Sequence, residues 1–207
     1  MDMNAQHDLS IIIQAGGGST RMGRNKALMP FFGRPLIVHI LDRLRPLAAE
    51  LLITTNQPEE FTMIDAPRIP DEIVGLGALG GLYTALRAAS FPLAAVVACD
   101  MPFVNADLLA AQRAILLNEQ VDAVLPRLDG GYEPFHAVYR VAACLPAVRK
   151  AIDAGQRRAI AWMPDVKVRE LTEREIRSFD PHLLAFMNVN TPEEFQQAEQ
   201  IASRLRS

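Results

Sequence analysis

The chain has 207 residues, half of them hydrophobic and 22% charged, a composition typical of a globular protein that can bury a core without disulfides. The net charge of −3 and the lack of a basic block argue against a nucleic-acid partner. No apolar run approaches the roughly 20 residues that cross a bilayer, and the polar start "MDMNAQHDLS" is unlike a signal peptide, so we expect a cytoplasmic protein with no membrane contact.

Apolar runs of strand length alternate with segments of helical period along the chain. The predicted strands are 9–14, 50–55, 93–100, 121–128, 134–140, 166–171 and 183–189. The predicted helices are 35–47, 77–90, 105–120 with Asn105 as its N-cap, 145–155, and a last helix that Thr191 and Glu194 open with a capping box. This alternation predicts an α/β fold with a mainly parallel sheet wrapped by helices, and we interpret residues 1–207 as one domain.

A glycine-rich, cationic stretch, "AGGGSTRMGRNK" (15–26), follows the first predicted strand directly. It is not a Walker A loop, because Arg24 stands where that motif needs lysine, Lys26 comes two residues too late, and Ala27 after it offers no hydroxyl for Mg²⁺. It is not a dinucleotide fingerprint either, because Arg21 occupies the position that packs a helix against a strand, where a long cation fits badly.

What remains is a nest of backbone N–H groups that would hold a phosphate-bearing ligand, with Arg21, Arg24 and Lys26 as counter-charges. The plain alternative is a glycine-rich surface loop with solvated charges. The connection to the next helix runs from about 15 to 35, and loops of that length in compact domains are usually functional. It also lies at the carboxyl end of the first strand, where open α/β sheets place their ligands.

Polar residues follow several of the predicted strands. Asp100 ends the apolar run "LAAVVACD", and a carboxylate beside a phosphate loop suits Mg²⁺, which prefers one or two carboxylates plus phosphate oxygens. The alternative is that Asp100 caps the turn that follows. Asn56, Asp71 and the "NVN" at 188–190 also follow apolar runs, and the carboxyl ends of parallel strands converge at one edge of the sheet.

Four segments carry a family resemblance: "AGGGSTRMGRNKAL", "GRPLI", "CDMPF" and "NVNTPEEF" occur in this order through nearly the whole chain. They resemble the molybdenum cofactor guanylyltransferases, nucleotidyltransferases with a Rossmann-like, glycosyltransferase-A-like fold and helices on both faces of the sheet. The resemblance implies an enzyme that transfers GMP from GTP to the phosphate of molybdenum-molybdopterin. Pyrophosphate would be released and the molybdopterin guanine dinucleotide cofactor formed, and proteins that deliver or accept the cofactor could bind transiently.

The resemblance also implies the roles of site residues. Arg21, Lys26 and Asp100 would serve catalysis, with Asp100 holding Mg²⁺, while Asn188 and Asn190 would lie on the pterin side. The residues that would bind the nucleotide are Gln14, Ala15, Gly16, Gly17, Gly18, Ser19, Arg21, Met22, Gly23, Lys26, Asn56, Asp71 and Asp100. Of these, residues 14–16 would contact the guanine, the loop 15–26 would bind the triphosphate, and Asn56 and Asp71 would hold the base and ribose.

The chain departs from the family pattern at two places. Gln14 stands where the family usually has an aliphatic residue, and "GALGG" (77–81) replaces G-P-L-[AG]-G. The nearest alternative function is a molybdenum cofactor cytidylyltransferase, whose loop resembles A-A-G where this chain has Ala15-Gly16-Gly17; the extra glycine favours a larger purine base. Further alternatives are another NTP-dependent nucleotidyltransferase, and a GTP-binding sensor without turnover, which would not need both Lys26 and Asp100.

Histidine and cysteine add little chemistry. His136 is the nearest candidate for a general base, but a satisfied histidine at a sheet edge is the commoner case, and an attacking phosphate is already ionised near neutral pH. The four histidines are scattered, which argues against a catalytic zinc site. Cys99 and Cys144 are too few and too far apart for a disulfide framework or a CxxC metal site.

Overall fold

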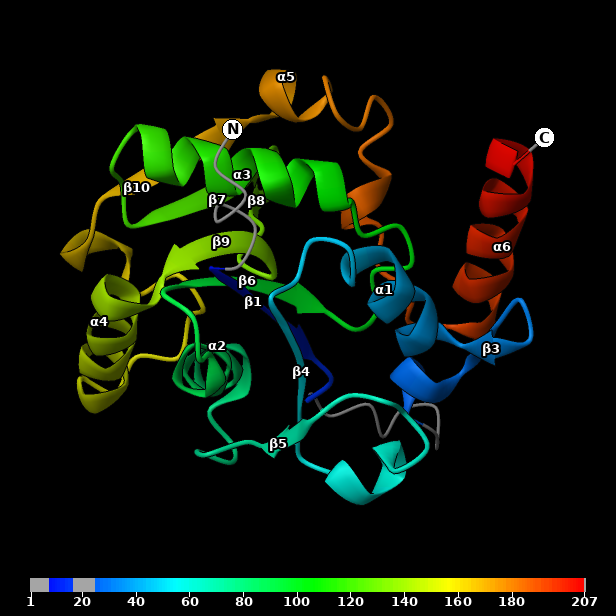
Figure 1. The fold of residues 1–207 in the computed structure, drawn as a ribbon, viewed down its shortest axis with the longest axis horizontal. Helices are drawn as coiled ribbons and strands as arrows, with labels where there is room; N and C mark the ends of the chain where they lie inside the picture. The colour runs from blue at the N-terminus through cyan, green and yellow to red at the C-terminus, as the bar shows by residue number, and fades with distance from the viewer. Residues whose placement is uncertain (1–7, 17–24, 207) are drawn as a thin grey trace.

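The computed structural model describes residues 8–16 and 25–206, and its described part is built on one large sheet of eight strands (Figure 1). The strands lie in the order β10 (Val168–Thr172), β7 (Ala123–Leu128), β9 (His136–Arg140), β6 (Leu93–Ala98), β1 (Leu9–Gln14), β4 (Glu50–Thr55) and β5 (Arg68–Pro70), while β8 (Gly131–Tyr132) pairs with β7. Pairing is parallel except where β9 runs between β6 and β7 and where β8 pairs with β7. The predicted α/β class with a mainly parallel sheet is confirmed.

Helices cover both faces of this sheet, as Figure 1 shows. The helices α1 (Leu36–Leu44), α3 (Ala106–Asn118) and α6 (Pro192–Arg206) pack on one face, and α2 (Gly77–Ala88) and α4 (Val141–Asp153) on the other. A short α5 (Glu173–Ile176) follows β10. Strand β1 is buried along its whole length, with Ile11 and Ile13 facing α1 and α3 and Ile12 facing α2. A strand that is covered on both faces typically has a nearly continuous apolar sequence, as in the "LSIIIQ" of β1.

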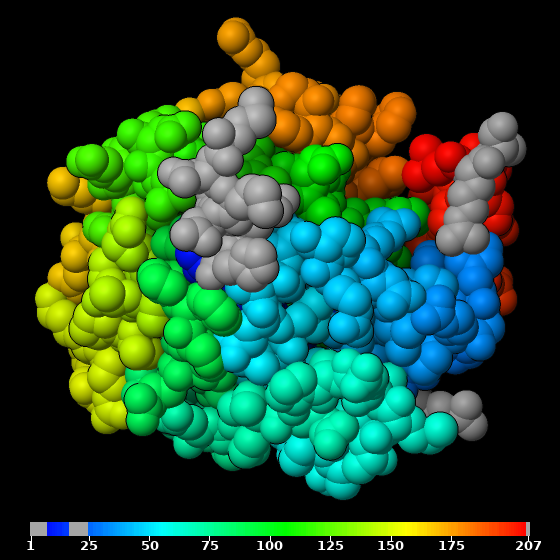
Figure 2. All heavy atoms as spheres, viewed as in Figure 1, coloured from blue at the N-terminus to red at the C-terminus, as the bar shows by residue number. Residues whose placement is uncertain are grey.

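The connection between β1 and α1 contains structure of its own. A 3-10 turn, η3 (Lys26–Leu28), leads into a hairpin of β2 (Pro30–Phe31) and β3 (Arg34–Pro35), separate from the main sheet. Its two turn residues, Phe32 and Gly33, both have positive φ, at 49° and 76°, as tight hairpin turns require. The Phe32 N–H donates to Glu199 of α6 at 2.6 Å, and Figure 2 shows this blue hairpin beside the red α6.

The predicted strand at 183–189 is wrong. Leu184–Phe186 form a 3-10 turn, η6, which Leu183 enters with a φ of 56°. The backbone groups here bond to partners other than a strand: the Ala185 N–H donates to Asp180 at 2.7 Å and the Val189 N–H to the Asp100 carbonyl at 2.9 Å. Because these backbone N–H groups already have hydrogen-bond partners, the segment does not need to pair with a sheet to satisfy them.

Other boundaries differ by a few residues. Strand β6 ends at Ala98, two residues before Asp100, and α4 begins at Val141 rather than 145, which places Pro146 inside the helix. The Asn105 cap of α3 is confirmed, since its side chain accepts from the Leu108 N–H at 3.0 Å. Two further 3-10 turns, η4 (Pro58–Phe61) and η5 (Met163–Asp165), complete the described elements.

Within the described ranges, every helix is too short or too polar to cross a bilayer. The cytoplasmic location and the single-domain organisation stay predictions from the sequence.

Candidate functional site

A cavity of about 340 Å³ opens at the carboxyl ends of β1 and β6, which are parallel neighbours at the centre of the sheet. The ends of these strands, the start of α2 and the residue before β9 surround it. Its lining consists of Gln14, Ala15, Gly16, Lys26, Gly77, Ala78, Ala98, Cys99, Asp100 and Phe135. Five of these residues, the first four and Asp100, belong to the set that the sequence predicted, so the fold brings them to one place.

Three segments far apart in the sequence meet at Lys26. Its ammonium lies 4.0 Å from Asp100 Oδ2 and donates to Asn190 Oδ1 at 2.5 Å. Backbone geometry supports this meeting, because the Val189 N–H donates to the Asp100 carbonyl and Asn25 caps the turn that begins at Lys26. The structure thus places a cation, a carboxylate and an amide together beside the cavity.

The Asp100 carboxyl is poorly solvated, and its side chain is 24% exposed. Burial raises the pKa of Asp100 above its usual value, while the nearby charge of Lys26 lowers it and that of Glu194 raises it. The net upward direction means that Lys26 does not fully offset the cost of burying a negative charge. An additional cation at this position would therefore stabilise the ionised carboxylate.

The donor set fits Mg²⁺ bound together with a phosphate-bearing ligand. In the described ranges, 8–16 and 25–206, no three or more His, Cys, Asp or Glu side chains gather into a cage for a metal ion. Mg²⁺ does not need such a cage, because it commonly takes one or two carboxylates and completes its shell with water and phosphate oxygens. Asp100 is the carboxylate that would hold the ion in such a site.

Asp71 and Asn56 lie at the ends of the neighbouring strands β5 and β4. Burial raises the pKa of Asp71, and a hydrogen bond from the Asn56 side chain lowers it in part. Asp71 Oδ1 is buried and has no hydrogen-bond partner among the described residues. A methyl group on Gly16 would lie 2.9 Å from Asp71 Oδ2, so a side chain at position 16 would force the Asp71 carboxylate to shift. An orphaned carboxylate oxygen beside glycine is a ready acceptor for a ligand hydroxyl.

His136 lies outside the cavity and is fully buried within the sheet. Its strand, β9, pairs on both sides, so the predicted place at a sheet edge is wrong. The ring nitrogen Nε2 accepts from the Asn105 backbone N–H at 3.2 Å, and burial lowers the pKa of His136 to about 4. The other ring nitrogen, Nδ1, is buried without a hydrogen-bond partner among the described residues, so the predicted satisfied histidine holds for Nε2 alone. Burial of His136 away from the cavity favours a structural role over that of a general base.

Residues 11–168 match the family described as MobA-like NTP transferase domain. The chain belongs to this family. A probable molybdenum cofactor guanylyltransferase of Pelotomaculum thermopropionicum is 33% identical over 95% of this chain and 94% of its own length. A molybdenum cofactor guanylyltransferase of Shewanella amazonensis is 33% identical over 91% of this chain and 94% of its own length.

Solved structures agree with the MobA-like assignment. The molybdopterin-guanine dinucleotide biosynthesis protein A of Archaeoglobus fulgidus superposes with a TM-score of 0.81 at 29% identity, covering 94% of this chain and 99% of that one. The 2-C-methyl-D-erythritol 4-phosphate cytidylyltransferase of Thermus thermophilus superposes with a TM-score of 0.66 at 20% identity, covering 93% and 98%. The second likeness shows the shared fold alone.

Part of the predicted site of this MobA-like chain lies outside the described residues: Gly17, Gly18, Ser19, Arg21, Met22 and Gly23. Asn188 is exposed, one residue before the backbone contact to Asp100, and its pterin-side role stays a prediction. The sequence missed Cys99 and Phe135 as lining residues. Phe135 lines the cavity because β9 runs antiparallel to β6, which places the residue before His136 at the carboxyl end of β6. There the Phe135 carbonyl accepts from the Ala98 N–H at 3.0 Å. The sequence alone did not predict this antiparallel strand.

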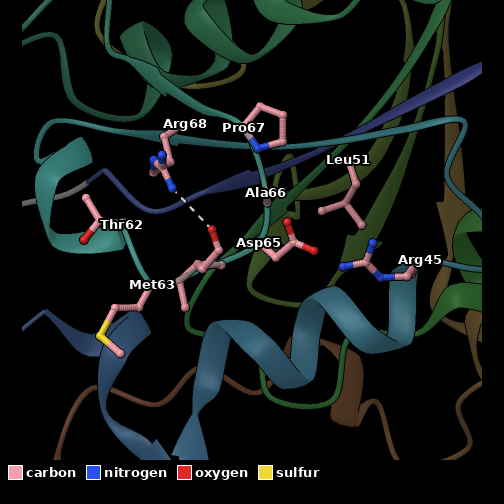
Figure 3. Close-up of a pocket in the computed structure, with 9 residues that line it drawn as sticks. Arg45, Leu51, Thr62, Met63, Asp65, Ala66, Pro67 and Arg68 are labelled. Atoms are coloured by element: carbon pink, nitrogen blue, oxygen red, sulfur yellow. Dashed lines mark hydrogen bonds between the residues drawn. The ribbon is translucent and has the colours of Figure 1, made fainter.

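A larger hollow of about 730 Å³ lies elsewhere on this MobA-like chain, between the end of α1 and the turn before β5 (Figure 3). Two arginines, Arg45 and Arg68, line it, and Arg68 Nη1 already donates to the carbonyls of Phe61 and Ile64 at 3.1 and 3.3 Å. The residues that line this hollow include none of those predicted for the site. The smaller cavity at the sheet edge is therefore the candidate site.

Proposed function

We propose that this MobA-like NTP transferase transfers GMP from GTP to the phosphate of molybdenum-molybdopterin, releasing pyrophosphate and forming molybdopterin guanine dinucleotide. The observation that carries the proposal is the pairing of Lys26 and Asp100, 4.0 Å apart at the rim of a cavity at the sheet edge. Relatives named molybdenum cofactor guanylyltransferase, similar along nearly the whole chain, support the choice of substrates. Proteins that deliver or accept the cofactor would be further, transient partners.

The reaction joins two anions, so repulsion and alignment are its main obstacles. An oxygen of the molybdopterin phosphate forms a bond to the α-phosphorus of GTP. The bond from that phosphorus to the bridging oxygen breaks, and this oxygen leaves with the bonding electrons as part of pyrophosphate. Because the attacking phosphate is already ionised near neutral pH, the step requires no general base, in keeping with the structural role of His136.

Lys26 offsets the negative charge that gathers around the α-phosphorus, and the bond to Asn190 holds its ammonium at the rim of the cavity. Asp100 would hold Mg²⁺ beside the phosphates. When bound, this ion supplies electrostatic stabilisation of the charge on the phosphates and the leaving group. Asp71 would accept a hydrogen bond from the nucleoside, Asn56 would donate or accept one, and Arg21 would add a second cation from the glycine-rich loop.

The direct test is product formation by the purified protein. With GTP, Mg²⁺ and molybdenum-molybdopterin present, we expect pyrophosphate release that depends on the pterin, and a product of the mass of the guanine dinucleotide. Tight GTP binding without pyrophosphate release would favour the sensor without turnover. Release with CTP but not GTP would assign the chain to the cytidylyltransferases.

Nucleotide preference gives a simpler prediction. The sequence Ala15-Gly16-Gly17, in place of the A-A-G of the cytidylyltransferases, motivates a preference for guanine, so GTP with Mg²⁺ should raise the melting temperature more than CTP or ATP does. A ligand at 100 times its Kd stabilises the folded state by about 2.7 kcal/mol, which a thermal scan measures readily. Equal shifts with CTP and GTP would contradict the guanylyl assignment while leaving the transferase assignment intact.

Replacement of Lys26 by alanine should weaken GTP binding and turnover without unfolding the protein. The change removes a charged hydrogen-bond donor worth about 1.5–3 kcal/mol, so we expect kcat/KM to fall roughly 10- to 100-fold. The matched control is Lys150→Ala, which removes an exposed ammonium paired with Asp165 outside the cavity. Wild-type activity in Lys26→Ala would move the phosphate-binding role to Arg21 and Arg24.

A further inference from the structure

The position of the Lys26 ammonium depends on Asn190 more than on Asp100. The ammonium donates to Asn190 Oδ1 at 2.5 Å, while Asp100 Oδ2, at 4.0 Å, lies beyond hydrogen-bond distance. A lysine side chain is long and flexible, so the place of its ammonium is set by the groups that bind it. Whatever holds Asn190 in place therefore also holds the Lys26 ammonium.

The backbone of Asn190, rather than its side chain, is held. Asn190 is exposed and lies in the irregular segment between η6 and α6, so neither burial nor secondary structure fixes it. The preceding residue, Val189, is fully buried, and its N–H donates to the Asp100 carbonyl at 2.9 Å. The N–H of Asn190 itself donates to Glu194 Oε2, which also accepts from the Thr191 N–H at 3.0 Å. The Glu194 carboxylate thus fixes the residue that binds the lysine.

Glu194 lies in the first turn of α6, and the hydrophobic core anchors that turn. The next residue, Phe195, is 4% exposed and, together with Ala198 one turn further on, packs into the core that α1 and α3 also line. Thr191 completes the anchoring, because its Oγ1 accepts from the Glu194 N–H at 3.2 Å. A carboxylate on an anchored helical turn is a fixed acceptor to which an irregular segment can be tied.

The plain alternative is that Glu194 only caps α6. In a capping box the glutamate at the third helical position accepts from the N–H of the N-cap residue, which here is Thr191. The bond from the Asn190 N–H is additional, since this group lies one residue before the cap and is not one of the unpaired N–H groups of the helix itself. This second bond places Asn190 and does nothing for the start of the helix.

We infer that Glu194 is a positioning residue of the candidate site: through Asn190 it holds the Lys26 ammonium at the rim of the cavity. The inference rests on the proposed function, because it takes Lys26 to act on the phosphates of a nucleotide. Glu194 acts without touching the substrate. Its tie to Asn190 is a hydrogen bond from a neutral N–H, so the amide oxygen of a glutamine can replace the carboxylate there.

The test compares two replacements of Glu194 in steady-state kinetics and thermal scans. Glu194→Ala should lower the melting temperature and should reduce kcat/KM for GTP roughly tenfold, because the ammonium is no longer aligned with the phosphates. Glu194→Gln keeps an acceptor oxygen and should return kcat/KM to within about twofold of the wild type. Wild-type kcat/KM in Glu194→Ala would overturn the inference, and so would an equal loss in both variants.

Thr191→Ala is the matched control for the cap alone. It removes the acceptor for the Glu194 N–H but leaves both backbone bonds to Glu194 Oε2 in place. This variant should lower the melting temperature and keep the wild-type kcat/KM. If Thr191→Ala lost as much kcat/KM as Glu194→Ala, fraying of the helix would explain both losses and the inference would fail.

The variant Asn190→Ala tests the coupling. Adding Glu194→Ala to it should cause no further loss of kcat/KM, because the amide that Glu194 places is already gone, whereas two independent losses would multiply and overturn the inference. The melting temperature should still fall further, since the cap is lost in either background. Should Glu194→Ala fail to fold, Glu194→Asp takes its place in every comparison, because it keeps the charge but is one methylene too short to bind both N–H groups.

Failure of the proposed function would look different. Calorimetric binding of inorganic tripolyphosphate reports the contact of Lys26 with phosphate without any turnover. If Lys26→Ala bound it as tightly as the wild type does, the phosphate role of Lys26 and the inference would fail together. If Lys26→Ala weakened binding and Glu194→Ala did not, only the positioning role would fail. If both variants weakened binding but the wild type turned over no GTP, the positioning role would stand without the transferase assignment.

Discussion

Asp100→Asn should reduce Mg²⁺-dependent pyrophosphate release roughly 10²- to 10³-fold, because removal of one preorganised electrostatic group commonly costs about 3–4 kcal/mol of transition-state stabilisation. Asparagine keeps the shape of the side chain but removes the charge that would hold the metal ion. GTP affinity should fall only modestly, since the glycine-rich loop and Lys26 would still bind the phosphates. Steady-state kinetics with a titration of Mg²⁺ measures both effects.

The folded state should tolerate the same substitution. Burial raises the pKa of Asp100, so neutral asparagine removes a charge that is costly to bury, and the melting temperature should stay the same or rise. If Asp100 only capped a turn, the variant would instead lose about 1 kcal/mol of stability and keep its turnover. The control is Asp129→Asn, which changes an exposed carboxylate at the β7–β8 turn and should leave both measurements unaltered. A destabilised but fully active Asp100→Asn would place the metal site elsewhere.

The second large effect concerns His136 and the acid stability of the protein. Burial lowers the pKa of His136 from the usual 6.5 to about 4. Between these pH values the imidazole is therefore protonated in the unfolded chain and neutral in the folded chain. The free energy of unfolding should therefore fall as the pH drops from 6.5 to 4, by roughly 3 kcal/mol from this residue. Above pH 6.5 both states are neutral at this position and the effect vanishes.

Urea unfolding of the wild type and of His136→Gln at several pH values between 7 and 4 measures this contribution. Glutamine keeps an acceptor for the Asn105 N–H but does not titrate, so its stability should depend less steeply on pH over that range. His182→Gln is the control, because this histidine is exposed, and its profile should follow the wild type. Parallel profiles for the wild type and His136→Gln would contradict the prediction.

Much of the fold could be predicted because local patterns and tertiary structure agree. The run "LSIIIQ" is buried on both faces, and "TPEE" forms the capping box, in which the Glu194 N–H donates to Thr191 Oγ1 at 3.2 Å. The segment at 183–189 failed because its hydrophobicity fills the core around Ala185 and Val189 while its backbone bonds to Asp180 and Asp100. Such partners lie too far along the chain for a local pattern to reveal them.

The site was only partly predictable for the same reason. Convergence of strand ends was enough to expect Lys26 near Asp100, but not that Asn190 would bind the lysine across 164 positions of sequence. Gln14 was recognised as a departure from the family pattern, but its packing against Gly81, on the helix that covers the strand, could not be predicted. A single sequence cannot show which glycine receives which side chain.

The bond between Lys26 and Asn190 has a consequence for how the enzyme is made. On the ribosome, a chain that has been translated through residue 168, where the family match ends, already contains the glycine-rich loop and Asp100. It still lacks the segment that anchors the lysine and that bonds to the Asp100 backbone through Val189. The candidate site is therefore completed by the last fifth of the polypeptide to be synthesised, and a nascent or prematurely terminated product would hold the Lys26 ammonium without its Asn190 partner.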